Sequence, residues 1–205
     1  MRKGRRKGFR RQIGLDRSGP PPRQTRPGEP LRPWTIPNAV GYIRLAGLPV
    51  FLYLAFSSGD GRDAWAAAIF WLIAFGDYVD GFLARATGQY SRMGAILDPI
   101  VDRLTILSGA AVCWHFELLP RWALAVLAVR EVVTALLAEI LLRRGGELKI
   151  NGLGRIAVGP VMASIFFAMV SDSWVWSAML IIGVILGVLG TIAYIRSGIR
   201  ELATA

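Results

Sequence analysis

Four aspartates stand inside stretches of the chain that are otherwise apolar. Asp77, Asp80, Asp98 and Asp102 lie within the segment GDYVDGFLARATGQYSRMGAILDPIVD. The first two are three positions apart and the last two are four apart, so each pair shares one face of a helix. Carboxylate oxygens from two facing helices suit a hard divalent cation such as Mg²⁺ or Mn²⁺. Four acids are enough for two ions, and two-ion sites clamp both oxygens of a phosphoryl displacement.

The apolar residues come in blocks that are long enough to cross a bilayer. The chain has 205 residues, of which 54% are hydrophobic, and a mean hydropathy of +0.45. Crossing the hydrocarbon core takes about 20 mostly apolar residues. Six stretches have this length: 38–57, 64–84, 95–115, 121–142, 153–171 and 174–195. We therefore predict an all-α integral membrane protein with six transmembrane helices in one domain, residues 34–205.

Residues 1–33 have a different composition. They hold eleven basic and two acidic residues, three consecutive prolines and few apolar residues. This predicts a disordered tail. Its expected partner is the anionic lipid surface, where each basic residue adds about 1 kcal/mol of attraction, rather than nucleic acid.

Loop charges predict the orientation in the membrane. The loops after the second and fourth stretches are basic, as is the end of the chain, whereas the other loops are neutral or acidic. Basic loops stay in the cytoplasm. We expect a multi-pass protein of the cell membrane with both termini cytoplasmic.

The second and third stretches would form an antiparallel hairpin. Asp77 then lies level with Asp102, and Asp80 level with Asp98, below the cytoplasmic surface. An aspartate at the centre of a span costs about 3 kcal/mol, so four of them must face inward. Gly76 and Gly81, beside two of the acids, are expected to let the two backbones approach closely.

Alternative roles for the four acids account for less of the pattern. Pairing with basic residues would need more cations than Arg85 and Arg103 supply. Helix capping explains only Asp98, which precedes Pro99. A cation transporter is the alternative from a different functional class. It explains the buried acids but not the glycines and the arginine at fixed offsets, and the chain lacks paired interrupted helices in two halves.

The complete pattern is Asp77-x2-Asp80-Gly81-x2-Ala84-Arg85-x8-Gly94-x3-Asp98-x3-Asp102, which fixes eight positions within 26 residues. It resembles the signature of the CDP-alcohol phosphotransferase family. Members transfer a phosphatidyl group from CDP-diacylglycerol to an alcohol and release CMP. The resemblance implies a six-helix membrane fold with an active site between helices at the cytoplasmic side. It also implies that the protein forms a homodimer.

The resemblance also implies roles for the acids. Asp77, Asp80 and Asp98 would bind one divalent ion, and Asp77, Asp98 and Asp102 would bind a second. Asp102 would also be the general base that takes the proton of the acceptor hydroxyl.

Further residues would contact the nucleotide of CDP-diacylglycerol. Gly81 would let the cytidine lie close to the backbone, and Arg85 would place a fixed cation beside the diphosphate. Pro37 and Asn38, at the start of the first stretch, and Ser91 would also lie near the nucleotide.

Arg44 stands about two turns into the first stretch. An arginine inside the bilayer needs an anionic partner, which the aspartate cluster or the diphosphate of the donor could supply. The alternative is an arginine that snorkels to the inner interface.

Basic residues in and beside the fourth and fifth stretches predict a site for the phosphate of the acceptor. Arg130 interrupts an apolar run, and its neighbour Glu131 is expected to be a poor partner because adjacent residues diverge on a helix. We therefore expect Arg130 and Arg155, together with Lys149, to bind the acceptor. A cytoplasmic loop charge is the alternative for Arg155.

The most detailed prediction concerns the identity of the acceptor. Residues 35–56 resemble the opening of the phosphatidylglycerophosphate synthase branch of the family. Glycerophosphate-using members often open the fifth helix with Gly-Lys-x-Lys-Thr, but this chain reads GLGRIAVG and lacks the second lysine. We rank the acceptors as glycerol 3-phosphate first, phosphatidylglycerol second, as in the cardiolipin synthases of the family, and inositol phosphate third.

Overall fold

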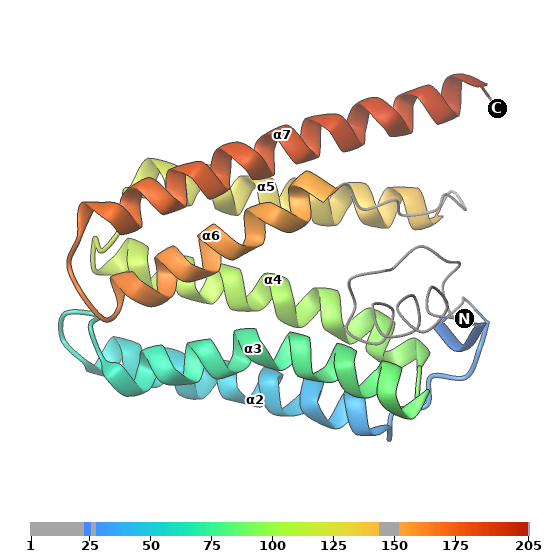
Figure 1. The fold of residues 1–205 in the computed structure, drawn as a ribbon, viewed down its shortest axis with the longest axis horizontal. Coiled ribbons are helices and arrows are strands. Elements are labelled where there is room, and N and C mark those ends of the chain that lie inside the picture. The colour runs from blue at the N-terminus through green and yellow to red at the C-terminus, as the bar shows by residue number, and fades with distance from the viewer. Residues whose placement is uncertain (1–22, 26–27, 144–151, 205) are drawn as a thin grey trace, which may run out of the picture. The chain divides into compact units, whose positions relative to one another are not determined.

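The computed structural model describes residues 23–25, 28–143 and 152–204, and the regular secondary structure of these residues is all helical (Figure 1). A short 3-10 helix, η1 (Arg23–Thr25), precedes six α-helices. These are α2 (Ile36–Ser57), α3 (Ala64–Thr87), α4 (Arg92–His115), α5 (Arg121–Arg143), α6 (Gly152–Ala168) and α7 (Trp174–Thr204). Each of the six predicted stretches corresponds to one helix, so the all-α prediction is confirmed. Residues 1–22 and 26–27 of the predicted tail lie outside the described residues.

Polar side chains begin several of the helices. Asp63 Oδ1 accepts a hydrogen bond from the backbone N of Ala66 at the start of α3. Ser91 Oγ accepts one from the backbone N of Gly94 at the start of α4. Such N-caps satisfy backbone donors that have no partner inside the helix. The helix bounds are therefore set by capping residues as well as by the apolar blocks.

The described residues fall into two compact units. The first unit contains those up to residue 51 together with 68–105, and the second contains 52–67 together with those from 106 onwards. The helices α2, α3 and α4 each contribute residues to both units.

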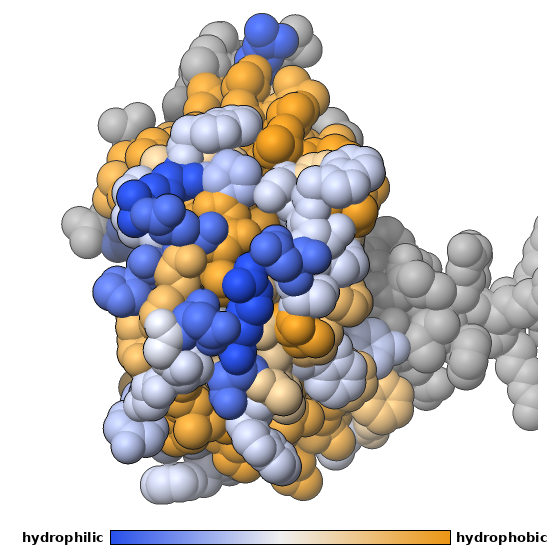
Figure 2. Space-filling view, turned by 90° about the vertical axis from the view of Figure 1, so that its left-hand side faces the viewer, coloured by the Kyte–Doolittle hydropathy of each residue, from blue (hydrophilic) through white to orange (hydrophobic). Residues whose placement is uncertain are grey.

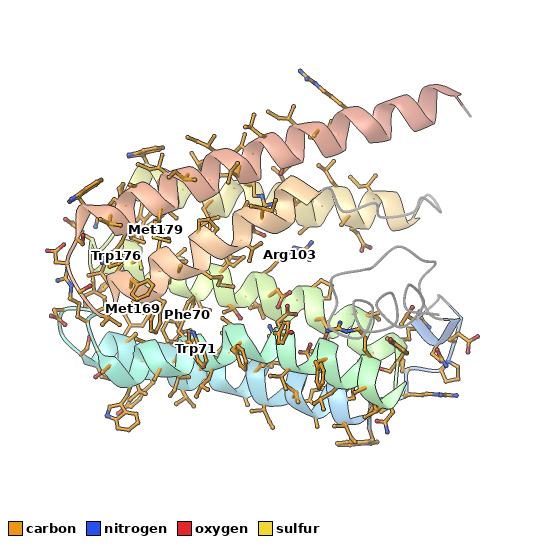
Figure 3. The ribbon with its side chains drawn as sticks, viewed as in Figure 1. Phe70, Trp71, Arg103, Met169, Trp176 and Met179 are labelled. Atoms are coloured by element: carbon orange, nitrogen blue, oxygen red, sulfur yellow. The ribbon has the colours of Figure 1, made fainter. Side chains whose placement is uncertain are left out.

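Within the first unit, α2 packs against both α3 and α4. Phe51 of α2 lies against Phe70 of α3, with ring centroids 5.3 Å apart, and the α3 helix runs antiparallel to α2 (Figures 1 and 3). A Cβ added to Gly41 of α2 would lie 2.8 Å from Cδ2 of Leu97 in α4. Glycine on α2 therefore allows α4 to approach closely, as small residues do in membrane helix packing.

Within the second unit, α6 and α7 form the closest helix pair. A Cβ on Gly183 of α7 would lie 2.7 Å from Cγ2 of Val161 and 3.1 Å from its backbone N. Ile165 of α6 and Leu180 of α7 are fully buried. The absence of a side chain at Gly183 therefore brings the two helices into backbone contact.

Large apolar side chains are exposed along most of the helices. Three helical segments are long and apolar enough to cross a membrane: α2, α3 and Trp174–Ala193 of α7. Exposed aromatic residues follow the same helices, such as Trp71, which stacks on Phe75 of α3 (Figure 3). Apolar exposure on this scale is typical of a surface that contacts lipid. Six spans stay a prediction, because α4 and α5 each carry several charged residues and α6 has 17 residues.

One end of the second unit has the character of a membrane–water interface. The loops between α2 and α3, α4 and α5, and α6 and α7 lie there, and Figure 2 shows hydrophilic residues gathered on this end. Trp65, Trp114, Trp122 and Trp174 are exposed at the helix ends next to these loops. Tryptophans at this position are typical of the interfacial belt of membrane proteins.

Candidate active site

The side chain of Arg44 lies between the carboxylates of α3 and α4. Its Nη1 donates to Oδ2 of Asp80 over 2.9 Å, and its Nη2 donates to Oδ1 of Asp102 over 2.5 Å. Oδ1 of Asp77 lies 3.6 Å from Nη1. One guanidinium therefore contacts three of the four acids that the sequence predicts as metal ligands. The expectation that the aspartate cluster is an anionic partner of Arg44 is therefore confirmed.

Arg44 is held in place by groups of α3. The residue is 3% exposed, which excludes the alternative that it snorkels to the interface. Its Nε donates to the carbonyl oxygen of Ile73 over 2.9 Å. A Cβ added to Gly76 would lie 2.7 Å from Cγ and Cδ of Arg44. The expectation that Gly76 brings the backbones of α3 and α4 together is therefore wrong, because this glycine makes room for a side chain of α2.

The four acids differ in their surroundings. The side chain of Asp80 is 4% exposed, whereas those of Asp77 and Asp102 are 50% and 41% exposed. Asp98 is partly buried and lies within α4, which begins at Arg92, so it does not cap the helix. Within the described part of the chain, its carboxylate has no hydrogen bond or ion pair. The cluster thus combines one buried acid, two half-exposed acids and one without a protein partner among those residues.

The donor set fits a divalent cation in its chemistry. Four carboxylates supply the hard oxygen ligands that Mg²⁺ and Mn²⁺ prefer. In the orientation observed, no three carboxylate, histidine or cysteine side chains of the described residues are close enough together to hold an ion. In this orientation the guanidinium of Arg44 is bonded to one oxygen of Asp80 and to one oxygen of Asp102. The ions themselves remain a prediction.

Asn38 and Ser91 form a buried link between the starts of α2 and α4. Ser91 Oγ donates to Oδ1 of Asn38 over 2.9 Å. Nδ2 of Asn38 donates to the carbonyl oxygens of Arg32 and Pro33, over 3.1 and 3.0 Å. A Cβ on Gly94 would lie 2.8 Å from Oδ1 of Asn38, so this glycine leaves room for the asparagine side chain of α2. The predicted contact of Asn38 and Ser91 with the nucleotide stays a prediction.

The other residues that are predicted to face the nucleotide lie on α3 and at the start of α2. A Cβ on Gly81 would lie 3.2 Å from Nη1 of Arg85, one turn further along α3. Gly81 therefore leaves room for the guanidinium of Arg85, which corrects the expectation that it admits the backbone of α4. Pro37 is buried in the first turn of α2. Contacts of these three residues with a nucleotide remain predictions.

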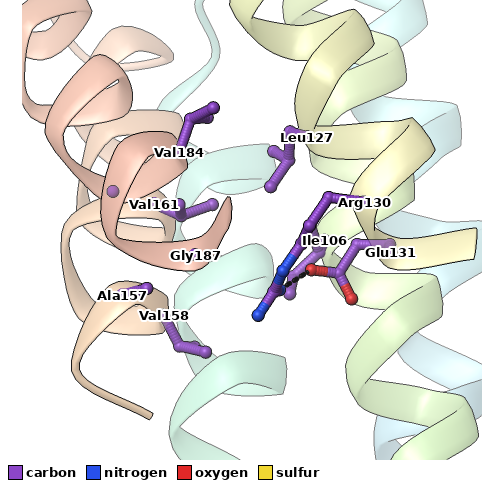
Figure 4. Close-up of a pocket in the computed structure, with 10 residues that line it drawn as sticks. Ile106, Leu127, Arg130, Glu131, Ala157, Val158, Val161, Val184 and Gly187 are labelled. Atoms are coloured by element: carbon purple, nitrogen blue, oxygen red, sulfur yellow. Dashed lines mark hydrogen bonds and ion pairs between the residues drawn. The ribbon is translucent and has the colours of Figure 1, made fainter. Parts of the chain in front are cut away.

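Arg130 and Glu131 line a pocket of the second unit, among apolar side chains that include Leu127, Val161 and Val184 (Figure 4). Nη1 of Arg130 donates to Oε1 of Glu131. The expectation that these neighbours pair poorly is wrong, because both side chains are long enough to fold toward each other and the buried Glu131 needs a cation. Nε of Arg130 is buried and has no hydrogen-bond partner within the described residues.

The side chains of the other two residues predicted to bind the acceptor lie outside the described part of the structure. Arg155 belongs to α6, but its side chain is outside the part of the structure that is described. Lys149 lies outside the described residues altogether. The structure therefore brings together Asp77, Asp80 and Asp102 around Arg44, and leaves the acceptor site as a prediction.

Comparison with known proteins identifies the family. Residues 34–189 match the family model for CDP-alcohol phosphatidyltransferases. The chain belongs to this family. The predicted membership and the predicted enzyme class, a phosphatidyltransferase that uses a CDP-alcohol, are therefore confirmed, and the cation-transporter alternative is dropped.

Individual relatives of this CDP-alcohol phosphatidyltransferase carry two kinds of name. A cardiolipin synthase (CMP-forming) of Streptomyces coelicolor is 39% identical over 150 residues, which cover 71% of this chain and 70% of the relative. A probable phosphatidylglycerophosphate synthase of Mycobacterium tuberculosis is 31% identical over 180 residues, which cover 80% and 82%. A CDP-diacylglycerol–glycerol-3-phosphate 3-phosphatidyltransferase of Cereibacter sphaeroides is 30% identical over 139 residues, which cover 64% and 62%. The acceptor is therefore not settled by similarity.

Proposed function

We propose that this phosphatidyltransferase uses phosphatidylglycerol as its acceptor and forms cardiolipin and CMP from CDP-diacylglycerol. The observation that carries the choice of acceptor is the stretch GLGRIAVG at the start of α6, which has Arg155 but no second basic residue. A phosphomonoester such as glycerol 3-phosphate carries close to two negative charges at neutral pH, because its second pKa is about 6. The phosphodiester of phosphatidylglycerol carries one. A site with one cation fewer suits the singly charged acceptor.

The relatives support the same choice. The cardiolipin synthase of S. coelicolor is 39% identical to this chain, against 31% and 30% for the two relatives named for phosphatidylglycerophosphate synthesis. This moves phosphatidylglycerol ahead of glycerol 3-phosphate, which the sequence alone ranks first. Glycerol 3-phosphate is retained as the second candidate, because the M. tuberculosis relative is matched over 82% of its length.

The reaction assigns a role to each part of the aspartate cluster. Asp77, Asp80, Asp98 and Asp102 would hold the divalent ions, Mg²⁺ or Mn²⁺, and such ions would supply positive charge that neutralises the diphosphate of the donor. Asp102 takes the proton of the acceptor hydroxyl as general base. The acceptor oxygen forms a bond to the phosphorus of the phosphatidyl group, and the bond from that phosphorus to the oxygen of CMP breaks. CMP leaves with the electron pair.

The remaining assignments follow the sequence. Gly81 and Arg85, at the end of α3, receive the nucleotide and its diphosphate, and Arg130 and Arg155 bind the phosphate of the acceptor. The protein crosses the cell membrane six times with both termini in the cytoplasm, as the alternation of basic loops supports. The active site faces the cytoplasm, and the basic tail binds anionic lipids. A homodimer is proposed by analogy with the family.

A panel of acceptors tests the function. The purified protein is incubated with CDP-diacylglycerol, Mg²⁺ and one of three acceptors: phosphatidylglycerol, glycerol 3-phosphate or inositol phosphate. We expect CMP release and a cardiolipin product with phosphatidylglycerol only. Formation of phosphatidylglycerophosphate would show instead that glycerol 3-phosphate is the acceptor. Absence of CMP release with every acceptor would contradict the proposed function.

A further inference from the structure

We propose that Arg44 is a built-in counter-cation of the aspartate cluster, and that it competes with the divalent ion for Asp80 and Asp102. The inference rests on the proposed metal site. It concerns a residue to which neither the family pattern at positions 77–102 nor the proposed reaction gives a role.

The first observation is the placement of the guanidinium. Arg44 donates one nitrogen to Asp80 and the other to Asp102, which come from α3 and α4, and Asp77 Oδ1 lies 3.6 Å away. Each contacted acid therefore uses one of its two oxygens for Arg44. Without this positive charge, the neighbouring carboxylates of this partly buried cluster would repel one another. Arg44 supplies the compensation that a metal ion would otherwise supply.

The second observation is that the place of Arg44 is built by the protein. Its Nε is bound to the carbonyl of Ile73, and the absence of a side chain at Gly76 makes room for its stem. The residue is almost completely buried. These contacts hold the guanidinium beside the acids. When an ion binds, Asp80 and Asp102 must therefore turn from Arg44 to the ion, while Arg44 remains close to them.

The third observation is that the acids do not converge while Arg44 spans them. No three potential ligands among the described residues lie close enough together to hold an ion. Ion–oxygen distances of about 2.1 Å for Mg²⁺ require carboxylates to meet at one point. Turning Asp80 and Asp102 toward one ion would weaken or break the hydrogen bonds that they accept from Arg44, so the two arrangements compete for these acids. Two interactions that compete must weaken each other equally, by thermodynamic linkage.

Binding of Mn²⁺ in the absence of any lipid substrate tests the competition. The full-length protein in detergent is titrated with Mn²⁺, and free ion is followed by electron paramagnetic resonance. We expect Arg44→Met to bind Mn²⁺ about 5-fold or more tightly than the unaltered protein, a coupling of the usual size between linked sites. Arg44→Lys keeps the charge but offers one nitrogen in place of the two that bond to Asp80 and Asp102, so its affinity should be intermediate. Arg103→Met is the matched control, since Arg103 donates to the carbonyl of Pro99 rather than to an acid.

Thermal unfolding gives a second, independent measurement. In excess chelator, Arg44→Met should unfold at a lower temperature than the unaltered protein, and saturating Mg²⁺ should remove most of the difference. If the unfolding temperature of Arg44→Met were lowered equally with and without Mg²⁺, Arg44 would have only a packing role and the inference would be overturned.

The results separate this inference from the metal site on which it rests. Equal or weaker Mn²⁺ binding by Arg44→Met, with clear binding by the unaltered protein, would overturn the competition and leave the metal site standing. Absence of Mn²⁺ binding by every form of the protein would overturn both.

Discussion

Arg44 and Gly76 are complementary residues on neighbouring helices. The arginine brings a positive charge to three acids, and the glycine provides the space that its stem fills. An unpaired charge at this depth would cost several kcal/mol, so neither the acids nor the arginine is tolerable alone. At the scale of the residue, the site depends on charge pairing and on one missing side chain.

Gly76→Ala should destabilise the protein by about 1–3 kcal/mol, because the added methyl group meets the arginine stem in a packed interior. The free energy of unfolding in detergent measures the effect. Gly159→Ala is the matched control, since a Cβ at this helical position of α6 meets nothing within 4 Å. That change should be neutral or slightly stabilising, as alanine is the better helix former. Equal effects of the two substitutions would contradict the assigned role of Gly76.

Asp102→Asn tests the proposed base. Loss of a general base usually costs about 10²–10⁴-fold in rate, and the turnover of CDP-diacylglycerol should fall by this amount. Binding of the liponucleotide should be largely retained. Asp60→Asn, in the exposed loop between α2 and α3, is the control and should leave turnover unchanged. Normal turnover of Asp102→Asn would remove this residue from the reaction.

At the scale of the element, the helices begin at polar residues, and one of these also makes a tertiary contact. Ser91 caps α4 and donates to the buried side chain of Asn38, which in turn holds residues 32–33. Ser173 makes a comparable contact with the backbone N of Val175 at the start of α7, at an exposed position. Ser91 differs from Ser173 in its bond to Asn38 and in being buried.

Ser91→Ala should therefore cost more than Ser173→Ala. Loss of a cap costs about 1 kcal/mol, and a buried acceptor left without its donor adds about 1–3 kcal/mol. The difference between the unfolding free energies of the two variants measures what the buried position of Ser91 and its bond to Asn38 contribute together. Losses of the same size would show that this bond contributes nothing to stability.

The helices were predictable from the sequence, because a span needs a long apolar block and each such block became a helix. The contacts between helices were less predictable. Position 44 meets position 76 only through the antiparallel packing of α2 on α3, in the register that also sets Gly47 against Ile73. Local spacing carries no information on this register. The same limit explains the wrong assignments of Gly76 and of the pairing between Arg130 and Glu131, which depend on what else surrounds each side chain.

At the scale of the whole molecule, the distribution of charge and apolar surface supports a membrane enzyme. Exposed apolar side chains cover the helices, whereas the excess of basic residues lies in the tail and in alternate loops. Basic residues that flank membrane helices favour the cytoplasmic face of the membrane.

Cysteine labelling tests the proposed topology. The single native cysteine, Cys113, is buried, so the unaltered protein should not react with a membrane-impermeant maleimide. Ser171→Cys, in the loop between α6 and α7, should be labelled in intact cells. Ala86→Cys, at the exposed end of α3, should be labelled only after the membrane is opened. Labelling of Ala86→Cys in intact cells, with Ser171→Cys labelled only after the membrane is opened, would show the opposite orientation.

The carboxylates of two helices are proposed to work together by holding a divalent cation, and every other assignment depends on this. The most direct measurement is CMP release by the purified protein from CDP-diacylglycerol and its acceptor, in Mg²⁺ and then in excess chelator. We predict that chelation abolishes turnover, that Mg²⁺ or Mn²⁺ restores it, and that Asp80→Asn prevents the restoration. Undiminished turnover in chelator would contradict the proposed role of the cation.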